Sequence, residues 1–444
     1  MTLTSQLERK PLESSFRLFG GIGRRRDYAL TFLTEFATLA STLLALKLAA
    51  TLWGASGFGE YMLARRTLSL LQLPILCGMG VAVTRYVARA RAASDPLVEH
   101  RYFTAGTLIA VITALAAAII LNLAPRPLAA LFFGSPDYAG LVRALSLMVT
   151  GSALHGVAYG MFRGQVAMGR ANFLQAINMG LVPVAVLAPS GLTVVQVVTL
   201  TGVLWCLIAG LAIAAILRGA PHHVWNRTLV RAAAGELLRY GGPRVPGEFA
   251  LGALFALPVT LAAHYDGVAA AGFVGLGISV LSMTGSFFAP LGQIVLPAVS
   301  ALTVGQRAPR LAEDTWRLTG LCVAIAAVLA LGVEVAAPFV IPRLFGPEFI
   351  QAVPIIRIMS IAAVPLVAFI VLRNVLDALH ESPLNAKNLV IALAVFLLLA
   401  LVIDSAYRVP IALSVGLVVL GTVSVVQARR ELARVGGHDA GRTV

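Results

Sequence analysis

The tripeptide Glu35-Phe36-Ala37 lies inside an apolar run near the start of the chain, and the same residues return as Glu248-Phe249-Ala250 inside another apolar run. The two copies are 248 − 35 = 213 residues apart. Other matches follow in chain order, at this offset or with a small drift: Gly59 and Gly272, Ala124-Pro125 and Ala337-Pro338, Leu131-Phe132 and Leu344-Phe345, Pro136-Asp137-Tyr138 and Pro347-Glu348-Phe349 at 211, and Arg163 and Arg373 at 210. Ordered matches at one period indicate an internal duplication.

The composition is that of a membrane protein. Hydrophobic residues make up 59% of the 444-residue chain and charged residues 12%, against about 25% charged residues in soluble domains. Apolar runs of about 20 residues, long enough to cross the hydrocarbon core as helices, recur along the chain. We predict an all-α integral membrane protein with twelve transmembrane helices in two pseudo-symmetric six-helix lobes, at residues 28–53, 60–83, 102–123, 140–162, 171–189, 193–217, 244–263, 268–294, 317–341, 352–372, 388–404 and 409–427.

The distribution of positive charge predicts the topology. The net charge is +14, and most Lys and Arg residues fall in connections that would share one side of the membrane with the N-terminus. The positive-inside rule therefore places both termini in the cytosol. Aromatic residues do not interleave with these charges, so we expect contact with the membrane surface and no nucleic-acid partner.

The duplication also predicts how the chain is divided. Repeats with an even number of spans share one orientation, as in the halves of several secondary transporters, which bind substrate between the halves. The outward connections are too short to form a catalytic domain, so we do not expect an enzyme. The predicted segments are a cytosolic leader at 1–27, an N-lobe at 28–217, a cytosolic linker at 218–239, a C-lobe at 240–428 and a cytosolic tail at 429–444.

The sequence predicts neither a metal site nor a bound cofactor. Cys77, Cys206 and Cys322 are scattered over three apolar runs, and His222-His223 has no ligand spacing to a cysteine or carboxylate. The chain also lacks a phosphate-binding loop for ATP. A coupling proton or Na⁺ is the one small partner that we expect.

Short motifs at the ends of several predicted spans carry a family resemblance. They are Gly57-Phe58-Gly59-Glu60-Tyr61, Ala82-Val83-Thr84-Arg85-Tyr86, Ala271-Gly272-Phe273, Leu296-Pro297 and Leu344-Phe345-Gly346-Pro347-Glu348-Phe349. With them the chain resembles the polysaccharide flippases of the MATE-like multidrug/oligosaccharidyl-lipid/polysaccharide (MOP) exporter superfamily. Twelve helices fit the O-antigen and exopolysaccharide type better than the fourteen-helix peptidoglycan-precursor flippases.

This resemblance implies a fold, a substrate and a location. The fold would be a V-shaped pair of six-helix bundles around a central cavity. The substrate would be a polyprenyl-pyrophosphate-linked glycan, moved by alternating access across the bacterial cytoplasmic (inner) membrane. We expect a monomer that works beside other polysaccharide-assembly proteins.

Two acidic residues occupy equivalent positions of the repeats at membrane depth. A charged side chain there costs at least ~2.5 kcal/mol on insertion scales, so Glu35 and Glu248 should face a partner or a water-filled cavity. Either could bind a coupling cation or a proton. Alternatively, each is neutralised locally: Arg244 lies one turn before Glu248, whereas the matching position before Glu35 is Thr31, which offers no positive charge.

Five basic residues lie within or at the edge of predicted spans, in their outer half: Lys47, Arg65, Arg66, Arg143 and Arg357. Because arginine binds phosphate groups through paired hydrogen bonds, these residues are candidates for binding the pyrophosphate and glycan. Alternatively, their long side chains reach the outer head groups. A further acid, Asp377, is expected to pair with Arg373, one turn earlier on the same helix.

Two alternatives stand beside a glycan-lipid flippase. A cation-coupled drug or metabolite antiporter would share the fold, and the fold by itself does not separate the two functions. A membrane-embedded glycan polymerase or glycosyltransferase would need a large outer loop or clustered carboxylates and histidines, and the sequence shows neither.

Overall fold

The computed structural model describes residues 22–220, 226–302, 308–379 and 384–440, and every regular element within these ranges is helical. The predicted leader therefore lies almost wholly outside the described residues, as do His222 and His223. The elements are α2 (Ile22–Leu76), α3 (Met79–Ala92), α4 (Pro96–Leu123), α5 (Pro125–Phe133), η1 (Pro136–Tyr138), α6 (Ala139–Gly164), α7 (Met168–Gln175), η2 (Ala176–Leu181), α8 (Val182–Leu187), α9 (Val194–Arg218), α10 (Arg227–Gly241), η4 (Gly242–Arg244), α11 (Val245–Asp266), α12 (Val268–Leu302), α13 (Ala308–Phe345), η5 (Pro347–Gln351), α14 (Ala352–Ile361), α15 (Ala363–Leu379), α16 (Leu384–Val402) and α17 (Arg408–Ala440).

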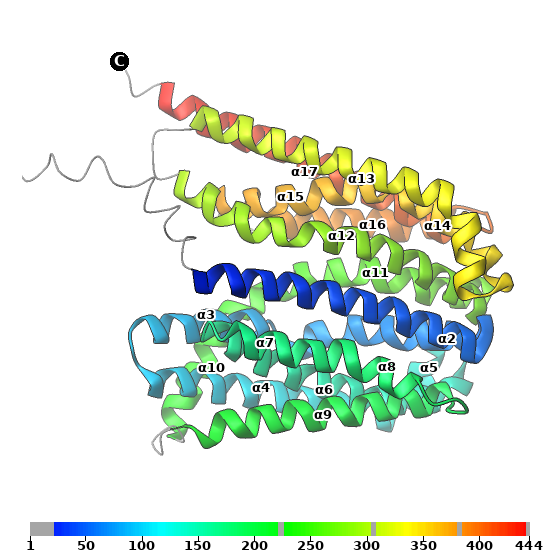
Figure 1. Ribbon diagram of the computed structural model, residues 1–444, viewed down its shortest axis with the longest axis horizontal. Coiled ribbons are helices and arrows are strands. Elements are labelled where there is room, and N and C mark those ends of the chain that lie inside the picture. The colour runs from blue at the N-terminus through cyan, green and yellow to red at the C-terminus, as the bar shows by residue number, and fades with distance from the viewer. Residues whose placement is uncertain (1–21, 221–225, 303–307, 380–383, 441–444) are drawn as a thin grey trace, which may run out of the picture.

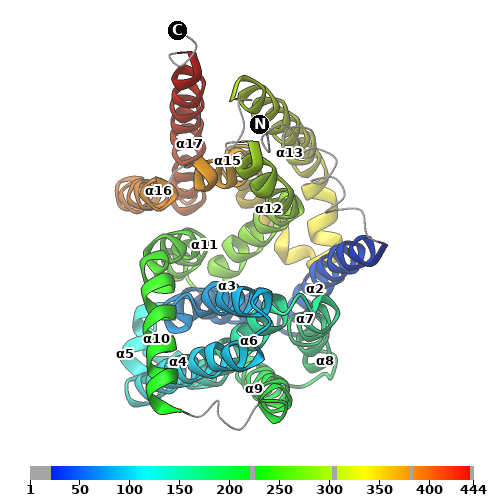
Figure 2. The ribbon, with the colours of Figure 1, turned by 90° about the vertical axis from the view of Figure 1, so that its left-hand side faces the viewer.

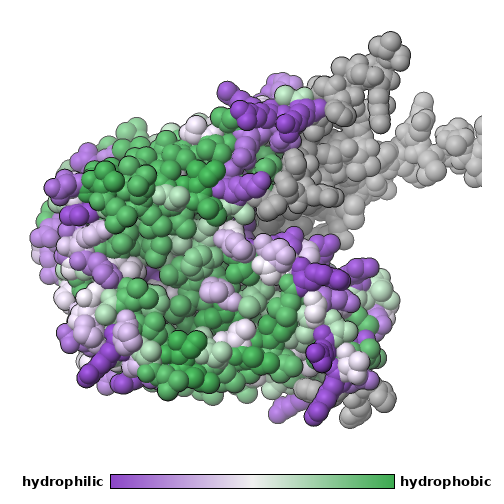
Figure 3. Space-filling model, turned by 180° about the vertical axis from the view of Figure 1, so that it is seen from behind, coloured by the Kyte–Doolittle hydropathy of each residue, from purple (hydrophilic) through white to green (hydrophobic). Residues whose placement is uncertain are grey.

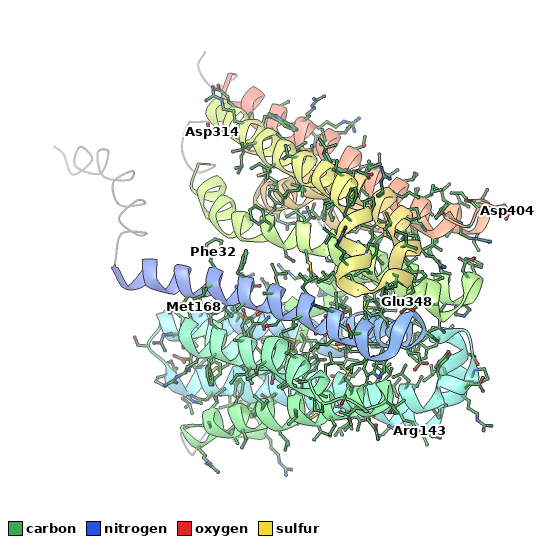
Figure 4. All side chains as sticks on the ribbon, turned by 45° about the vertical axis from the view of Figure 1, so that its right-hand side comes forward. Phe32, Arg143, Met168, Asp314, Glu348 and Asp404 are labelled. Atoms are coloured by element: carbon green, nitrogen blue, oxygen red, sulfur yellow. The ribbon has the colours of Figure 1, made fainter. Side chains whose placement is uncertain are left out.

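The helices form two groups that lie side by side. Helices α2 to α9 make the first group and α11 to α17 the second, with α10 across one end of the first group (Figures 1 and 2). A broad apolar belt separates hydrophilic ends (Figure 3), as expected for a multi-pass membrane protein. We call the end that carries the α3–α4 turn, α10 and the last turns of α17 the arginine-rich end. Asp314 lies there, whereas Glu348 and Asp404 lie at the opposite end (Figure 4).

Helix α2 consists of two arms that meet at Gly54. Gly54 has φ 60° and ψ −166°, which interrupts the helix, and the second arm returns toward the arginine-rich end (Figure 1). We expected a loop at residues 54–59, between the first two predicted spans. This expectation is wrong, because the single residue Gly54 makes the turn. The second arm ends at Leu76 instead of continuing to residue 83, since Cys77 and Gly78 adopt positive φ before α3 begins.

Ten helices among the described residues are long and apolar enough to cross a membrane, and the count is eleven if α14 and α15, bent by 41° at Ala362, form one span. In that count α2 is a single helix, although each of its arms is about as long as one crossing requires. The number of twelve stays a prediction, as do the lobe boundaries. Helix α10 occupies much of the expected linker, and α17 extends through the expected tail to Ala440.

A glycine stripe on α6 permits close packing inside the first group. Gly156, Gly160 and Gly164 recur every fourth residue and share one face. A Cβ added to Gly160 would lie 3.0 Å from the backbone oxygen of Gly80, and one added to Gly164 would lie 2.7 Å from Val87 Cβ. This contact holds α3 against α6 at the arginine-rich end.

Candidate functional site

The first arm of α2 carries a polar stripe. Thr31, Glu35, Thr38 and Thr42 follow at intervals of three and four residues, so they share one helical face. Thr38 and Thr42 line a pocket of about 280 Å³ inside the first group. Glu35 therefore lies one turn from the pocket lining, toward the arginine-rich end.

The pocket lining combines polar and apolar side chains, and several helices contribute to it. The second arm of α2 supplies Tyr61, Arg65 and Gln72, while α7 supplies Gln175 and α9 supplies Thr201. The Arg65 guanidinium lies 5.6 Å from the centre of the Tyr61 ring. Among the five predicted substrate-binding residues, Arg65 is the one that lines this pocket.

A buried hydrogen-bond network stands behind the pocket wall. His155 Nε2 lies 3.0 Å from Gln175 Oε1, and His155 Nδ1 lies 3.2 Å from Asn178 Nδ2. Trp205 Nε1 donates to the Asn178 backbone oxygen at 2.6 Å. Asn178 lies in the π-helical segment η2, and π-helical segments are frequent at functional sites. Sequence analysis missed this network, although a histidine and an asparagine inside apolar runs could have indicated it.

Glu35 has a basic neighbour on another helix. The charge of Arg163, near the end of α6, acts on the Glu35 carboxylate, and both groups act on Tyr159. The Arg163 guanidinium lies 5.6 Å from the Tyr159 ring, which stacks on His155 at 5.7 Å. The fold thus supplies a positive neighbour for Glu35 that the residues next to it in sequence do not provide. Through Tyr159, Arg163 is also connected to the His155 network.

Glu248 pairs with a residue that the sequence did not indicate. Arg373 Nη2 donates to Glu248 Oε1 at 2.8 Å, and Arg373 Nε lies 3.9 Å from Asp377 Oδ2. The predicted Arg373–Asp377 pair is therefore confirmed, as a long contact. The predicted local pair with Arg244 is wrong, because Arg244 lies in the 3-10 turn η4 and donates instead to the Tyr240 backbone oxygen at 2.9 Å.

Arg66 lies at the contact between the two groups. Its Nη2 donates to Ser279 Oγ of α12 at 2.9 Å. Its Nε is buried, with no hydrogen-bond partner among the described residues. No carboxylate in the described part of the chain forms an ion pair with it. Arg66 is therefore a partly buried cation at the junction, held by a neutral hydroxyl.

Arg357 is engaged by an acid that sequence analysis overlooked. Arg357 Nε donates to Glu334 Oε2 at 2.6 Å, and Ser360 Oγ donates to Glu334 Oε1 at 2.9 Å. The Glu334 side chain is 22% exposed and that of Arg357 50%. Glu334 lies in the apolar part of α13 and needs a partner there. Arg357 supplies that partner, and its half-exposed side chain leaves its predicted contact with substrate or head groups a prediction.

Lys47 and Arg143 lie away from the pocket. Lys47 is exposed on the side of α2 that also exposes Leu44 and Phe36, whereas the pocket face carries Thr38. Arg143 is exposed near the start of α6, toward the end of the molecule that carries Asp404 (Figure 4). The structure thus distributes the predicted cations over several places.

A family model for polysaccharide biosynthesis proteins matches residues 26–303, which is more than half of the chain. The chain belongs to the polysaccharide biosynthesis protein family. A comparison with curated proteins gives no match. The recognition from short motifs is therefore confirmed at the level of the family.

Solved structures show the fold of this polysaccharide biosynthesis protein. An inward-facing multidrug resistance MATE family transporter of the MOP superfamily matches with a TM-score of 0.77 and 14% identity, over 92% of this chain and 99% of the other. An outward-facing MATE transporter of the same superfamily matches with a TM-score of 0.64 and 15% identity, over 93% and 96%. A MATE in complex with MaL6 matches at 0.62 and 13%, over 91% and 97%. Family and fold are those of membrane transporters.

The helix arrangement agrees better with the inward-facing MATE transporter, at a TM-score of 0.77, than with the outward-facing one, at 0.64. In this polysaccharide biosynthesis protein the ribbons of the two groups diverge toward the arginine-rich end (Figure 1). At the opposite end they meet: a Cβ added to Gly59 of α2 would lie 1.9 Å from the backbone oxygen of Val268 in α12.

Proposed function

We propose that this protein flips a polyprenyl-pyrophosphate-linked oligosaccharide from the cytosolic to the outer leaflet by alternating access, for surface polysaccharide biosynthesis. The observation that supports this most is Arg66, a partly buried cation with a fully buried Nε at the junction of the two groups, which lacks a carboxylate partner among the described residues. An uncompensated buried charge is costly. A pyrophosphate that passes between the groups would supply the negative charge and the paired oxygen atoms that arginine binds well.

The other basic residues have different parts in this proposal. Arg65, beside Arg66 in sequence but stacked on Tyr61 in the pocket, would bind glycan or pyrophosphate oxygens. Lys47 and Arg143 would act toward the release side. Arg357 contributes only if it leaves Glu334, so it ranks last among the five.

Coupling is assigned to the two repeated acids. Protonation or Na⁺ binding at Glu35, at Glu248 or at both would bias the alternation of the two groups about the α2–α12 contact. Glu35 is the stronger candidate, because Glu248 already holds Arg373 as its counter-ion. The arginine-rich end would face the cytosol of a bacterial cell, in its inner membrane, by the positive-inside rule, and the unit would be a monomer.

Translocation in liposomes tests the proposal. A polyprenyl-pyrophosphate oligosaccharide is placed in one leaflet, and its appearance in the other leaflet is followed with and without a proton or Na⁺ gradient. Wild-type protein should move the lipid, and Arg66→Gln should abolish the movement. Ser279→Ala, which removes only the neutral hydroxyl partner, should preserve most of it. If wild-type protein moves no glycan lipid, the flippase proposal is wrong.

The cation-coupled drug antiporter remains the second candidate, and the pocket one turn from Glu35, with its mixed polar and apolar lining, favours it. Such a pocket could accept an amphiphilic solute as well as a glycan. Gradient-driven efflux of cationic dyes from the same liposomes, with no glycan-lipid movement, would favour this function.

A further inference from the structure

Two guanidinium groups lie against one tyrosine ring at the arginine-rich end. The Cζ of Arg85 lies 4.3 Å from the centre of the Tyr240 ring, and the Cζ of Arg244 lies 3.9 Å from it. Tyr86 packs against the same ring at 5.9 Å, with its plane nearly perpendicular. Arg85 belongs to α3 of the first group and Arg244 to the turn η4 that leads into the second group. The Tyr240 ring therefore contacts two guanidinium groups of like charge, one from each side of the junction between the two helix groups.

The neighbouring acids are engaged elsewhere. Glu236, one turn before Tyr240 on α10, accepts a hydrogen bond from Tyr102 Oη at 2.6 Å. Glu248, one turn after Arg244, is bound by Arg373. Over the described ranges, neither arginine of this cluster forms an ion pair. The two positive charges thus repel each other without a protein counter-ion.

The cluster is rigidly placed next to the junction. A Cβ added to Gly78 would lie 2.7 Å from the Gly241 backbone oxygen, so the end of α10 is pressed against the α2–α3 break. Viewed from the arginine-rich end, α3 lies on the side of the first group that is nearest to α11 and α12 (Figure 2). An anion bound by this cluster would therefore sit at the mouth between the two groups.

The chemistry of the cluster fits a phosphate ester. Stacking on an aromatic face orients a guanidinium and leaves N–H groups available for hydrogen bonds. Arg244 uses its Nη1 for the Tyr240 backbone oxygen, which fixes the guanidinium beside the ring. The remaining N–H groups of the two arginines can bind the oxygens of one phosphate or pyrophosphate group, and the anion would relieve the repulsion between the arginines.

We propose that Arg85, Tyr240 and Arg244 form a docking site for the pyrophosphate of an isoprenoid lipid, which the substrate occupies before its pyrophosphate reaches Arg66. The identity of this lipid rests on the proposed function. The same phosphate chemistry is offered by the head groups of bulk anionic phospholipids, so the experiment has to separate these two sources.

Binding of a fluorescent short-chain polyprenyl pyrophosphate, measured by anisotropy with the full-length protein in phosphatidylcholine nanodiscs, tests the site. The double variant Arg85→Gln/Arg244→Gln should bind about tenfold more weakly or worse, because two charge-assisted hydrogen-bonding groups are lost. Tyr240→Phe keeps the ring and should bind as the wild type does, whereas Tyr240→Leu should bind more weakly. Arg231→Gln is the matched control, since Arg231 is an exposed arginine on the same helix α10.

Three outcomes would overturn the inference. In the first, the double variant binds with wild-type affinity while Arg66→Gln abolishes binding; this leaves the proposed function intact. In the second, phosphatidylglycerol in the nanodiscs displaces the probe as well as inorganic pyrophosphate does; the site then belongs to bulk anionic lipid. In the third, wild-type protein binds no probe, which also counts against the proposed function, and the liposome assay then decides that question separately.

Discussion

Arg66 and Ser279 are hydrogen-bonded to each other at 2.9 Å and stand 213 positions apart, the same offset that relates the two Glu-Phe-Ala tripeptides. Gly59 and Gly272 have this offset too, and a Cβ on Gly272 would lie 3.0 Å from Gly59 Cα. Equivalent residues of two repeats touch each other where a pseudo-twofold axis passes between them. The α2–α12 contact therefore lies on the pseudo-symmetry axis of the two repeats. In the proposed alternating access it would be the pivot between the two groups.

This pivot predicts that Gly59→Ala is damaging. The new Cβ would lie 1.9 Å from the Val268 backbone oxygen, so the two helices must separate. Overpacking of this kind costs about 1–3 kcal/mol, and we expect the midpoint of thermal unfolding in detergent to fall accordingly. Gly210→Ala, on α9 with open space around the added Cβ, is the control and should leave the midpoint unchanged. Equal midpoints for the two variants would contradict the tight contact between α2 and α12 at Gly59.

A second prediction concerns the network behind the pocket. Asn178 is fully buried and links His155 to the π-helical segment. We expect Asn178→Ala to lower the free energy of unfolding by about 1–3 kcal/mol, because a buried ring nitrogen loses its partner. Asn122→Ala should cost little, since Asn122 is exposed and bonds only to its own helix at Ala118. Denaturation of both variants in one detergent would compare them, and equal losses would argue against the network.

The fold was predictable because hydropathy and repeated motifs can be read directly from the sequence. Apolar runs predicted most helices, and the offset of 213 predicted the equivalence of Glu35 and Glu248. Turn geometry was harder: nothing around Gly54 indicated that one residue with positive φ would replace a loop.

The candidate site was less predictable because its partners meet through tertiary packing. Arg163 of α6 acts on Glu35 only through its charge, without an ion pair among the described residues, whereas Arg373 of α15 forms an ion pair with Glu248. The repeat itself held a hint that sequence analysis did not use. Arg163 and Arg373 match each other in the duplication, so each repeated acid has a repeated arginine for a neighbour.

The Glu334–Arg357 pair gives a third prediction. Glu334→Gln leaves Arg357 without its partner in an apolar helix pair, and Arg357→Gln does the same to Glu334. Each single variant should lose about 2 kcal/mol, because an unpaired charge at membrane depth is costly. The double variant should regain part of this loss, which a double-mutant cycle on unfolding midpoints would measure. Strictly additive losses would show that the pair is not coupled.

A fourth prediction follows from the geometry around Arg373. This one guanidinium contacts both Glu248 and Asp377. Asn385 donates through its Nδ2 to Asp377 Oδ1, while its own Oδ1 is buried without a hydrogen-bond partner among the described residues. Arg373→Gln would free two carboxylates beside this amide oxygen, and all three groups are suitable ligands for a hard cation. Na⁺ should therefore raise the unfolding temperature of Arg373→Gln over that in choline, and should do so less for wild-type protein. An identical response of both proteins would exclude a latent cation site.

The last prediction concerns Glu35, the acid of the polar stripe. Glu35→Gln keeps the size of the side chain but removes the charge that Arg163 and Tyr159 experience. If Glu35 couples transport to a cation, export in cells should be abolished while the amount of protein in the membrane stays the same. Glu313→Gln is the matched control, because Glu313 is an exposed acid that pairs with Arg317 at 2.6 Å and should be dispensable. Loss of protein from the membrane would instead indicate a structural role for Glu35, and unchanged export would remove it from the coupling mechanism and leave Glu248 as the remaining repeated acid.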